Sequence, residues 1–243
     1  MAANETDWKA DPNYSYRELD RIGSTTKTYE VTMIQGSRYR RLIAENEEPL
    51  SPQASANERR KLEKVTAQRR AESPDQRQKR IAQYEKERTR DHLMMGQLTQ
   101  AFDFKFIGSR IVDSHDVYVL RATPRKGYKP PNMETQVLTG MRGELWIDKK
   151  AFQWVKVTAH VMRPVSIQGF LAQVQPGTRF ELEKMPVDEG IWLPKHFEMK
   201  SNAKVLFLFD RSDQEDNTFF DYRKLANTDS ASTSTPTANG RSK

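Results

Sequence analysis

The chain has 243 residues, of which 36% are hydrophobic and 30% charged, with a formal net charge of +7 and no cysteine. This length allows one large or two small domains, and the missing cysteine excludes thiol catalysis, disulfides and cysteine-based zinc sites. No apolar run approaches the roughly 18 residues that a membrane-spanning helix requires.

The first thirteen residues carry no clear structural pattern, and residues 1–13 are predicted to be a flexible N-terminus. Met1–Asp7 lacks the apolar centre of a signal peptide. That fits either a cytosolic protein or a periplasmic protein whose signal peptide has been removed. Strands are predicted next, because short runs rich in β-forming residues alternate in polarity, at Tyr14–Leu19, Tyr29–Met33 and Arg38–Ile43.

Two helix starts follow, and they predict a helical insertion at about residues 50–98. Ser51 precedes Pro52, and Ser73 precedes Pro74, so each serine can cap a helix that has proline at its first position. Gln76 completes a capping box with Ser73. Few large apolar residues follow between Asn57 and Asp91, which predicts a helical pair that touches the sheet by one ridge: Leu62, Val65, Ile81 and Tyr84.

The segment Asn57–Asp91 also holds most of the positive charge. It contains 12 Lys or Arg residues against 7 Asp or Glu residues. The acids are interleaved with the bases at helical spacing, so mutual solvation explains them more simply than phosphate binding does. We therefore expect no nucleic acid partner, and contact with an anionic membrane surface or an envelope protein remains open.

Alternating strands resume after the insertion. The strongest pattern is the hairpin Gly143–Met162, whose two strands are joined by the turn Asp148–Lys150. In the second strand, one face is formed by Val155, Val157, Ala159 and Val161. Other predicted strands are Phe102–Phe106, Asp116–Thr123, Thr178–Lys184, Lys195–Phe209 and Phe219–Leu225.

A separate short helix is predicted over Val165–Gln175. Its apolar residues Ile167, Phe170, Leu171 and Val174 are spaced i, i+3, i+4 and i+7, and Pro176-Gly177 would end it. Residues 226–243 are dominated by small polar residues and are predicted to be a disordered tail.

This order predicts an α+β fold with one dominant, curved antiparallel sheet. About nine strands are too many for a flat sheet, so the sheet should curl. Its concave apolar face then needs a cover, which the Val165–Gln175 helix is short and apolar enough to provide.

The chain resembles the LolA/LolB-type lipoprotein carrier superfamily, and in particular outer-membrane lipoprotein-sorting-like periplasmic proteins. The resemblance extends over residues 14–225 and is carried chiefly by Arg142-Gly-Glu-Leu-Trp-Ile-Asp148, Gln153-Trp-Val-Lys-Val157 and Ile191-Trp-Leu-Pro-Lys195. It implies a single domain, an unclosed β-barrel with helices over its mouth, that carries lipid or lipoprotein acyl chains in the periplasm. We expect a monomer.

An acyl chain needs only an apolar concavity, since each buried CH₂ contributes roughly 0.8 kcal/mol. The alternative is that the same residues form an ordinary core. The candidate lining residues are Phe104, Phe106, Leu145, Ile147, Val155, Val157, Phe180, Leu182, Phe197, Met199, Val205 and Phe207, with Ile167, Phe170 and Leu171 on the lid.

The sequence gives no sign of an enzyme. No HExxH, GxSxG or phosphate-binding glycine loop is present. The four histidines are scattered without metal-ligand spacing: His92, His115, His160 and His196. We therefore expect no catalytic residues, no metal and no cofactor.

Overall fold

The computed structural model describes residues 2–167, 172–201 and 214–226. Its centre is an antiparallel sheet of eleven strands in the order β4-β3-β2-β1-β13-β12-β11-β8-β7-β6-β5. Strands β4 and β5 lie at opposite edges, so the sheet is not closed into a barrel, as predicted. The strands of this sheet are β1 (Tyr14–Ile22), β2 (Thr25–Ile34), β3 (Ser37–Glu45), β4 (Glu48–Pro49), β5 (Phe102–Val112), β6 (His115–Pro124), β7 (Met141–Asp148), β8 (Trp154–Val161), β11 (Arg179–Asp188), β12 (Ile191–Lys200) and β13 (Gln214–Lys224).

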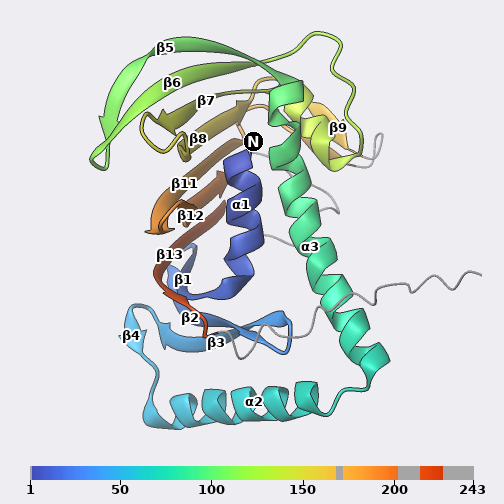
Figure 1. Cartoon of the computed structure of the whole chain (residues 1–243), viewed down its shortest axis with the longest axis vertical. Helices are drawn as coiled ribbons and strands as arrows, with labels where there is room; N and C mark the ends of the chain where they lie inside the picture. The colour runs from blue at the N-terminus through green and yellow to red at the C-terminus, as the bar shows by residue number, and fades with distance from the viewer. Residues whose placement is uncertain (1, 168–171, 202–213, 227–243) are drawn as a thin grey trace, which may run out of the picture.

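Helices α1 and α3 lie on one side of the curved sheet, and α2 lies at its β2–β3 end (Figure 1). In Figure 1 the sheet curves from β5 to β4 with α1 inside the curve, while α3 runs along the open side and α2 lies beneath β2 and β3. None of the described helices is long and apolar enough to cross a membrane. The helices are α1 (Ala2–Ala10), η1 (Asp11–Asn13), α2 (Pro52–Arg70), α3 (Pro74–Ala101) and η2 (Glu134–Gly140).

The predicted helical insertion is confirmed. Ser51 caps α2, since its side chain accepts a hydrogen bond from the Ala54 N–H. Ser73 and Gln76 form the predicted capping box at the start of α3. Both prolines occupy the first helical turn, where a missing N–H has no consequence.

Basic side chains, and not only an apolar ridge, fasten the insertion to the sheet. The Arg69 guanidinium of α2 donates hydrogen bonds to the carbonyl oxygens of Ile34, Ser37 and Arg38. Arg80 of α3 donates to the carbonyl oxygen of Gln35 and pairs with Glu72 at 2.6 Å. Part of the positive charge of the insertion is therefore structural.

The prediction of a flexible N-terminus does not match the structure. Residues 2–10 form α1, which contacts β12. The side chain of Asp7 in α1 is buried and accepts a hydrogen bond from the backbone N–H of Trp192 at 2.9 Å. This buried carboxylate helps to anchor a helix whose sequence has no apolar stripe, and Trp8 of the same helix stacks on His92 of α3.

The predicted lid helix over Val165–Gln175 is wrong for the residues that the structure describes. Val165–Ile167 and Ala172–Val174 are antiparallel strands, β9 and β10, with Val165 opposite Val174. Short apolar runs fit helical and strand templates alike, and the β-branched residues here favour the strand. Phe170 and Leu171 lie outside the described residues.

Among the described residues, two clusters of buried side chains form the core. One lies where the end of α3 meets the sheet and includes Phe102, Ala122, Leu138 and Val161. The other includes Val117, Val119, Trp146 and Trp192. The first cluster attaches α3 to the same strands that carry most of the candidate binding residues.

Candidate functional site

An apolar row crosses six neighbouring strands of the sheet. Residues that pair across antiparallel strands share a face, so the register assigns the row directly. From β5 to β12 its members are Phe106, Leu120, Leu145, Val157, Leu182 and Phe197. Five of these six are predicted site residues, and the sixth, Leu120, was not singled out by the sequence.

A second row runs beside the first on the same face. It consists of Phe104, Ala122, Gly143, Ala159, Phe180 and Met199. Its middle members are small because the chains approach closely there: a Cβ on Gly143 would lie 2.0 Å from the Thr158 carbonyl oxygen. Bulky residues are therefore confined to the two ends of this row.

The face that carries both rows is the one that the helices cover. Met94 and Leu98 of α3 pack against the cluster that contains Ala122, with Ala159 and Phe180 at its margin. Lys184 continues the alternation of Phe180 and Leu182 along β11, and it forms an ion pair with Asp7 of α1. The rows thus face the inside of the curve.

Several members of the rows remain partly accessible. Phe106 is 57% exposed and Phe104 is 37% exposed, whereas Leu145 is buried. Residues of intermediate burial are Ile147, Val157, Phe180, Leu182, Phe197 and Met199. This part of the face is therefore neither fully buried nor fully exposed to solvent.

Other predicted site residues do not join the rows. A β-bulge between Trp146 and Ile147 displaces Val155, which packs with Val117, Val119 and Trp146 in the second core cluster. The alternation that places Val155 beside Val157 is broken by this bulge. Ile167 lies in β9, and Val205 and Phe207 are outside the described residues.

Where the first apolar row continues beyond β12, its members become polar. Phe197 pairs with Asn217 of β13, and Asn217 pairs with Asp20 of β1. Glu18, two residues from Asp20, is only 8% exposed and lies 3.2 Å from the Arg40 guanidinium. The sequence could have predicted that Glu18 and Asp20 lie on the same strand face as Tyr14 and Tyr16, because the four residues follow one another at a spacing of two.

Burial raises the pKa of Glu18 to about 7, with Arg40 opposing the shift and Asp20 adding to it. The neutral carboxyl is therefore favoured in the folded chain. A raised carboxyl pKa contributes stability that is complete below about pH 4.5 and is lost as the pH rises through about 7.

Glu18→Gln should remove this pH dependence. We expect the free energy of unfolding of the wild type, relative to Glu18→Gln, to fall by roughly 2–4 kcal/mol across that interval. Urea unfolding at a series of pH values measures the difference. Parallel stability curves for the two proteins would show that Glu18 titrates normally.

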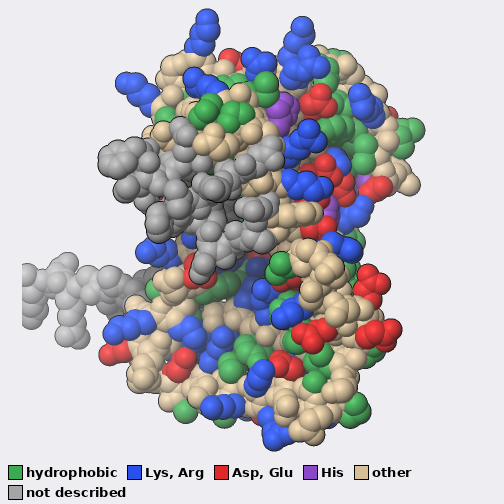
Figure 2. Space-filling view, turned by 180° about the vertical axis from the view of Figure 1, so that it is seen from behind, with side chains coloured by type: hydrophobic (Ala, Val, Ile, Leu, Met, Phe, Trp, Pro, Cys, Tyr) green, Lys and Arg blue, Asp and Glu red, His purple; other side chains and the backbone are tan. Residues whose placement is uncertain are grey.

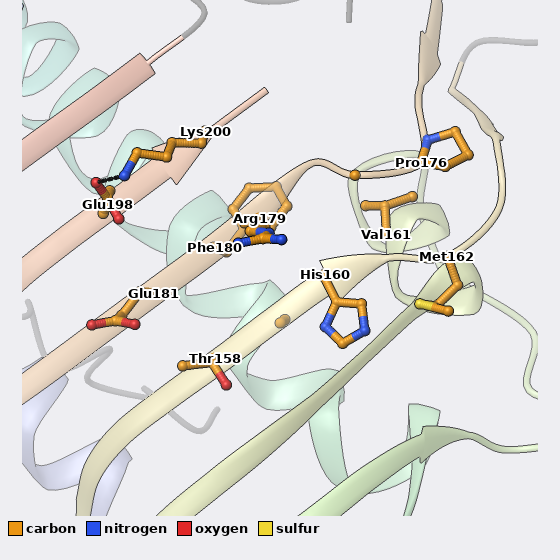
Figure 3. A pocket seen from close by; sticks show the side chains of 12 residues that line it. Thr158, His160, Val161, Met162, Pro176, Arg179, Phe180, Glu181, Glu198 and Lys200 are labelled. Carbon is orange, nitrogen blue, oxygen red and sulfur yellow. Dashed lines mark ion pairs between the residues drawn. The ribbon is translucent and has the colours of Figure 1, made fainter. Parts of the chain in front are cut away.

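A groove lies where β8 and β12 end and β11 begins. It has a volume of about 590 Å³, within the usual range for ligand sites. Apolar Val161, Met162 and Phe180 line it together with polar His160 and Arg179, and Figure 3 shows these side chains reaching it from neighbouring strands. The groove therefore joins the end of the second apolar row to polar side chains of the opposite face.

Charge on the surface is mixed. In Figure 2, basic and acidic side chains lie side by side over much of the face that is shown. Among the described residues, no group of three or more His, Asp or Glu side chains is placed to hold a metal ion. The described surface thus offers a ligand apolar contacts and separate charged groups of both signs.

Comparison with known proteins gives distant structural likenesses. No protein-family model matches the chain, and no curated protein sequence matches it significantly. Among solved structures, it is similar to proteins of the LolA superfamily.

One such structure is a LolA superfamily protein from Nitrosomonas europaea, with 14% identity over 92% of this chain and 93% of that chain and a TM-score of 0.30. Another is an outer membrane lipoprotein-sorting protein domain from Vibrio parahaemolyticus, with 10% identity over 90% of each chain and a TM-score of 0.32. A DUF1329 family protein from Desulfovibrio piger has 12% identity over 92% of each chain and a TM-score of 0.31. Likenesses this distant do not transfer a function, which must be inferred from the chain's own residues.

Proposed function

We propose that this protein is a non-enzymatic, periplasmic binding protein or carrier for the acyl chains of lipids or lipoproteins. The observation that supports this most directly is the apolar row of Phe106, Leu120, Leu145, Val157, Leu182 and Phe197, which is unbroken across six strands. It lies on the covered face of an open sheet, and its members range from buried to 57% exposed.

The physical chemistry of such a face suits a hydrocarbon chain. Neighbouring strands are about 4.8 Å apart, so six strands offer an apolar path of about 24 Å. An acyl chain of about a dozen methylenes would gain roughly 0.8 kcal/mol for each CH₂ that leaves water. No specific polar contact is needed for tight binding.

Native mass spectrometry of the purified protein tests the proposal. We expect adducts whose masses match lipids, which disappear after delipidation and return on addition of a long-chain fatty acid. A fluorescent fatty acid should bind the delipidated protein and be displaced by an unlabelled one. The absence of both adducts and probe binding would end the proposal.

The helical insertion is a second candidate surface, for an anionic membrane or an envelope protein. Basic residues on its exposed side have no ion pair among the described residues, including Arg59, Lys64, Arg70 and Lys79. Arg69 and Arg80, by contrast, are engaged with the sheet. A contact through the insertion would use the first set and leave the second undisturbed.

A further inference from the structure

Four basic residues form a straight row on the outer face of the sheet. Arg142 of β7 pairs with His160 of β8, His160 with Arg179 of β11, and Arg179 with Lys200 of β12. All four are exposed. At about 4.8 Å between strands, the row is about 14 Å long. These residues are far apart in the sequence, and only the strand register brings them together.

Acids lie next to the row on the same face of the sheet, at Glu144, Glu181 and Glu198, but two charges of the row have no ion pair among the described residues. Within residues 2–167, 172–201 and 214–226, Lys200 pairs with Glu198 at 2.6 Å, while neither Arg142 nor Arg179 has a carboxylate within ion-pair distance. Glu181, the nearest acid along β11, is held by Lys156 at 2.5 Å. Among the described residues, the guanidinium groups of Arg142 and Arg179 are therefore exposed and have no carboxylate partner.

The position of the row connects it to the groove. His160, Arg179 and Lys200 line the 590 Å³ groove together with Met162 and Pro176 (Figure 3). Met162 is 49% exposed. Basic side chains beside exposed apolar ones are typical of a surface that meets lipid headgroups, because the bases pair with phosphates while the apolar groups enter the interface.

We infer that the row of Arg142, His160, Arg179 and Lys200 docks the protein onto an anionic bilayer surface through lipid phosphate groups. Docking there brings the groove, and with it the end of the second apolar row, against the membrane from which an acyl chain would enter or leave. This inference rests on the proposed acyl-binding function for its purpose, but the docking itself is measured independently.

Vesicle flotation tests the docking surface. Wild-type protein should float with vesicles of equal parts phosphatidylcholine and phosphatidylglycerol, and should not float with phosphatidylcholine alone. The double variant Arg142→Glu/Arg179→Glu should bind the anionic vesicles at least about 25-fold more weakly, at a factor of about five for each basic residue removed from the surface.

A matched control separates the row from bulk charge. Lys126→Glu/Lys129→Glu changes the net charge equally at two exposed positions between β6 and η2, and it should keep most of the binding. Equal losses in the two double variants would overturn the inference. If the glutamate pair does not fold, Arg142→Gln/Arg179→Gln provides the same comparison against Lys126→Gln/Lys129→Gln.

Two further measurements fix the source of the phosphate and the relation to acyl binding. Inorganic phosphate, at constant ionic strength, should not displace the protein from anionic vesicles; displacement would mean that the row holds free phosphate instead. Fluorescent fatty acid binding without vesicles should be the same in wild type and Arg142→Glu/Arg179→Glu. Flotation that depends on the row, without any fatty acid binding, would support the docking surface and end the proposed function. Fatty acid binding without flotation that depends on the row would support the proposed function and end the docking inference.

Discussion

Replacing Asp7 with alanine should lower the free energy of unfolding by about 3–5 kcal/mol, the usual result of breaking a buried ion pair. Asp7 is 3% exposed, and its carboxylate accepts hydrogen bonds from Lys184 at 2.5 Å and from the Trp192 N–H at 2.9 Å. The Lys184 side chain is only 10% exposed. Burial lowers the pKa of Lys184, while Asp7 opposes this shift. Without Asp7 the Lys184 ammonium would lose its counter-ion and keep only its hydrogen bond to Asn4, and the Trp192 N–H would lose its acceptor. Urea unfolding measures the difference.

A pair of control variants isolates the electrostatic contribution of Asp7. Lys184→Met alone should leave the Asp7 carboxylate buried without its cation and should also destabilise the protein. Asp7→Leu/Lys184→Met should recover most of the loss, since apolar replacements of both partners are often neutral. A decrease of less than about 1 kcal/mol for Asp7→Ala would show that the pair behaves like an exposed one.

Val157→Glu should reduce the affinity for a fluorescent fatty acid by about 100-fold, which corresponds to roughly 2.7 kcal/mol. Val157 lies in the middle of the apolar row, between Leu145 and Leu182. A carboxylate there would interrupt the path of the hydrocarbon chain and would have to be desolvated when the chain binds. Fluorescence titration of the delipidated protein measures the effect.

Thr158→Glu is the matched control for this variant. Thr158 is the next residue of β8, and its side chain lies on the opposite face of the sheet, paired with Glu144 and Glu181. We expect it to bind the fatty acid like the wild type, and circular dichroism should show that both variants keep their strands. Equal losses in the two variants would mean that the inner face is not the binding surface.

Much of the sheet could be predicted because strand alternation is a local signal. The hairpin around Asp148 forms as expected, with the Asp148 carboxylate accepting hydrogen bonds from the Lys150 and Ala151 N–H groups. The helix starts at Ser51 and Ser73 are equally local, since each depends on residues within one turn. For these elements, the information lies in neighbouring residues.

The features that the sequence did not reveal depend on distant contacts. Helix α1 is held by the pairing of Asp7 with Lys184, which is 177 positions away. The bulge that displaces Val155 follows from the register of β7 and β8. It cannot be predicted from the alternation of apolar and polar residues along β8. Likewise, the basic row requires four strands to be aligned before Arg142 and Lys200 can be compared.

The candidate binding face could be predicted only in part, because it depends both on local alternation and on the order of the strands. Alternation correctly groups Leu145 with Ile147 and Phe180 with Leu182, yet it cannot say which strands are neighbours. The sheet order adds Leu120 to the row and shows that the row stops at β13. Sequence patterns thus predict the faces of single strands, and the strand order decides how far the apolar surface extends.

The change from Phe197 to Asn217, and onward to Asp20, makes the inner face asymmetric from one end to the other. A molecule with a hydrocarbon tail and a polar head would meet these two halves unequally. Along the first apolar row, its tail would be favoured over β5 to β12 and its head near Asn217 and Asp20. Such a gradient would impose one polarity on any bound amphiphile, so that its two ends could not exchange places at equal free energy.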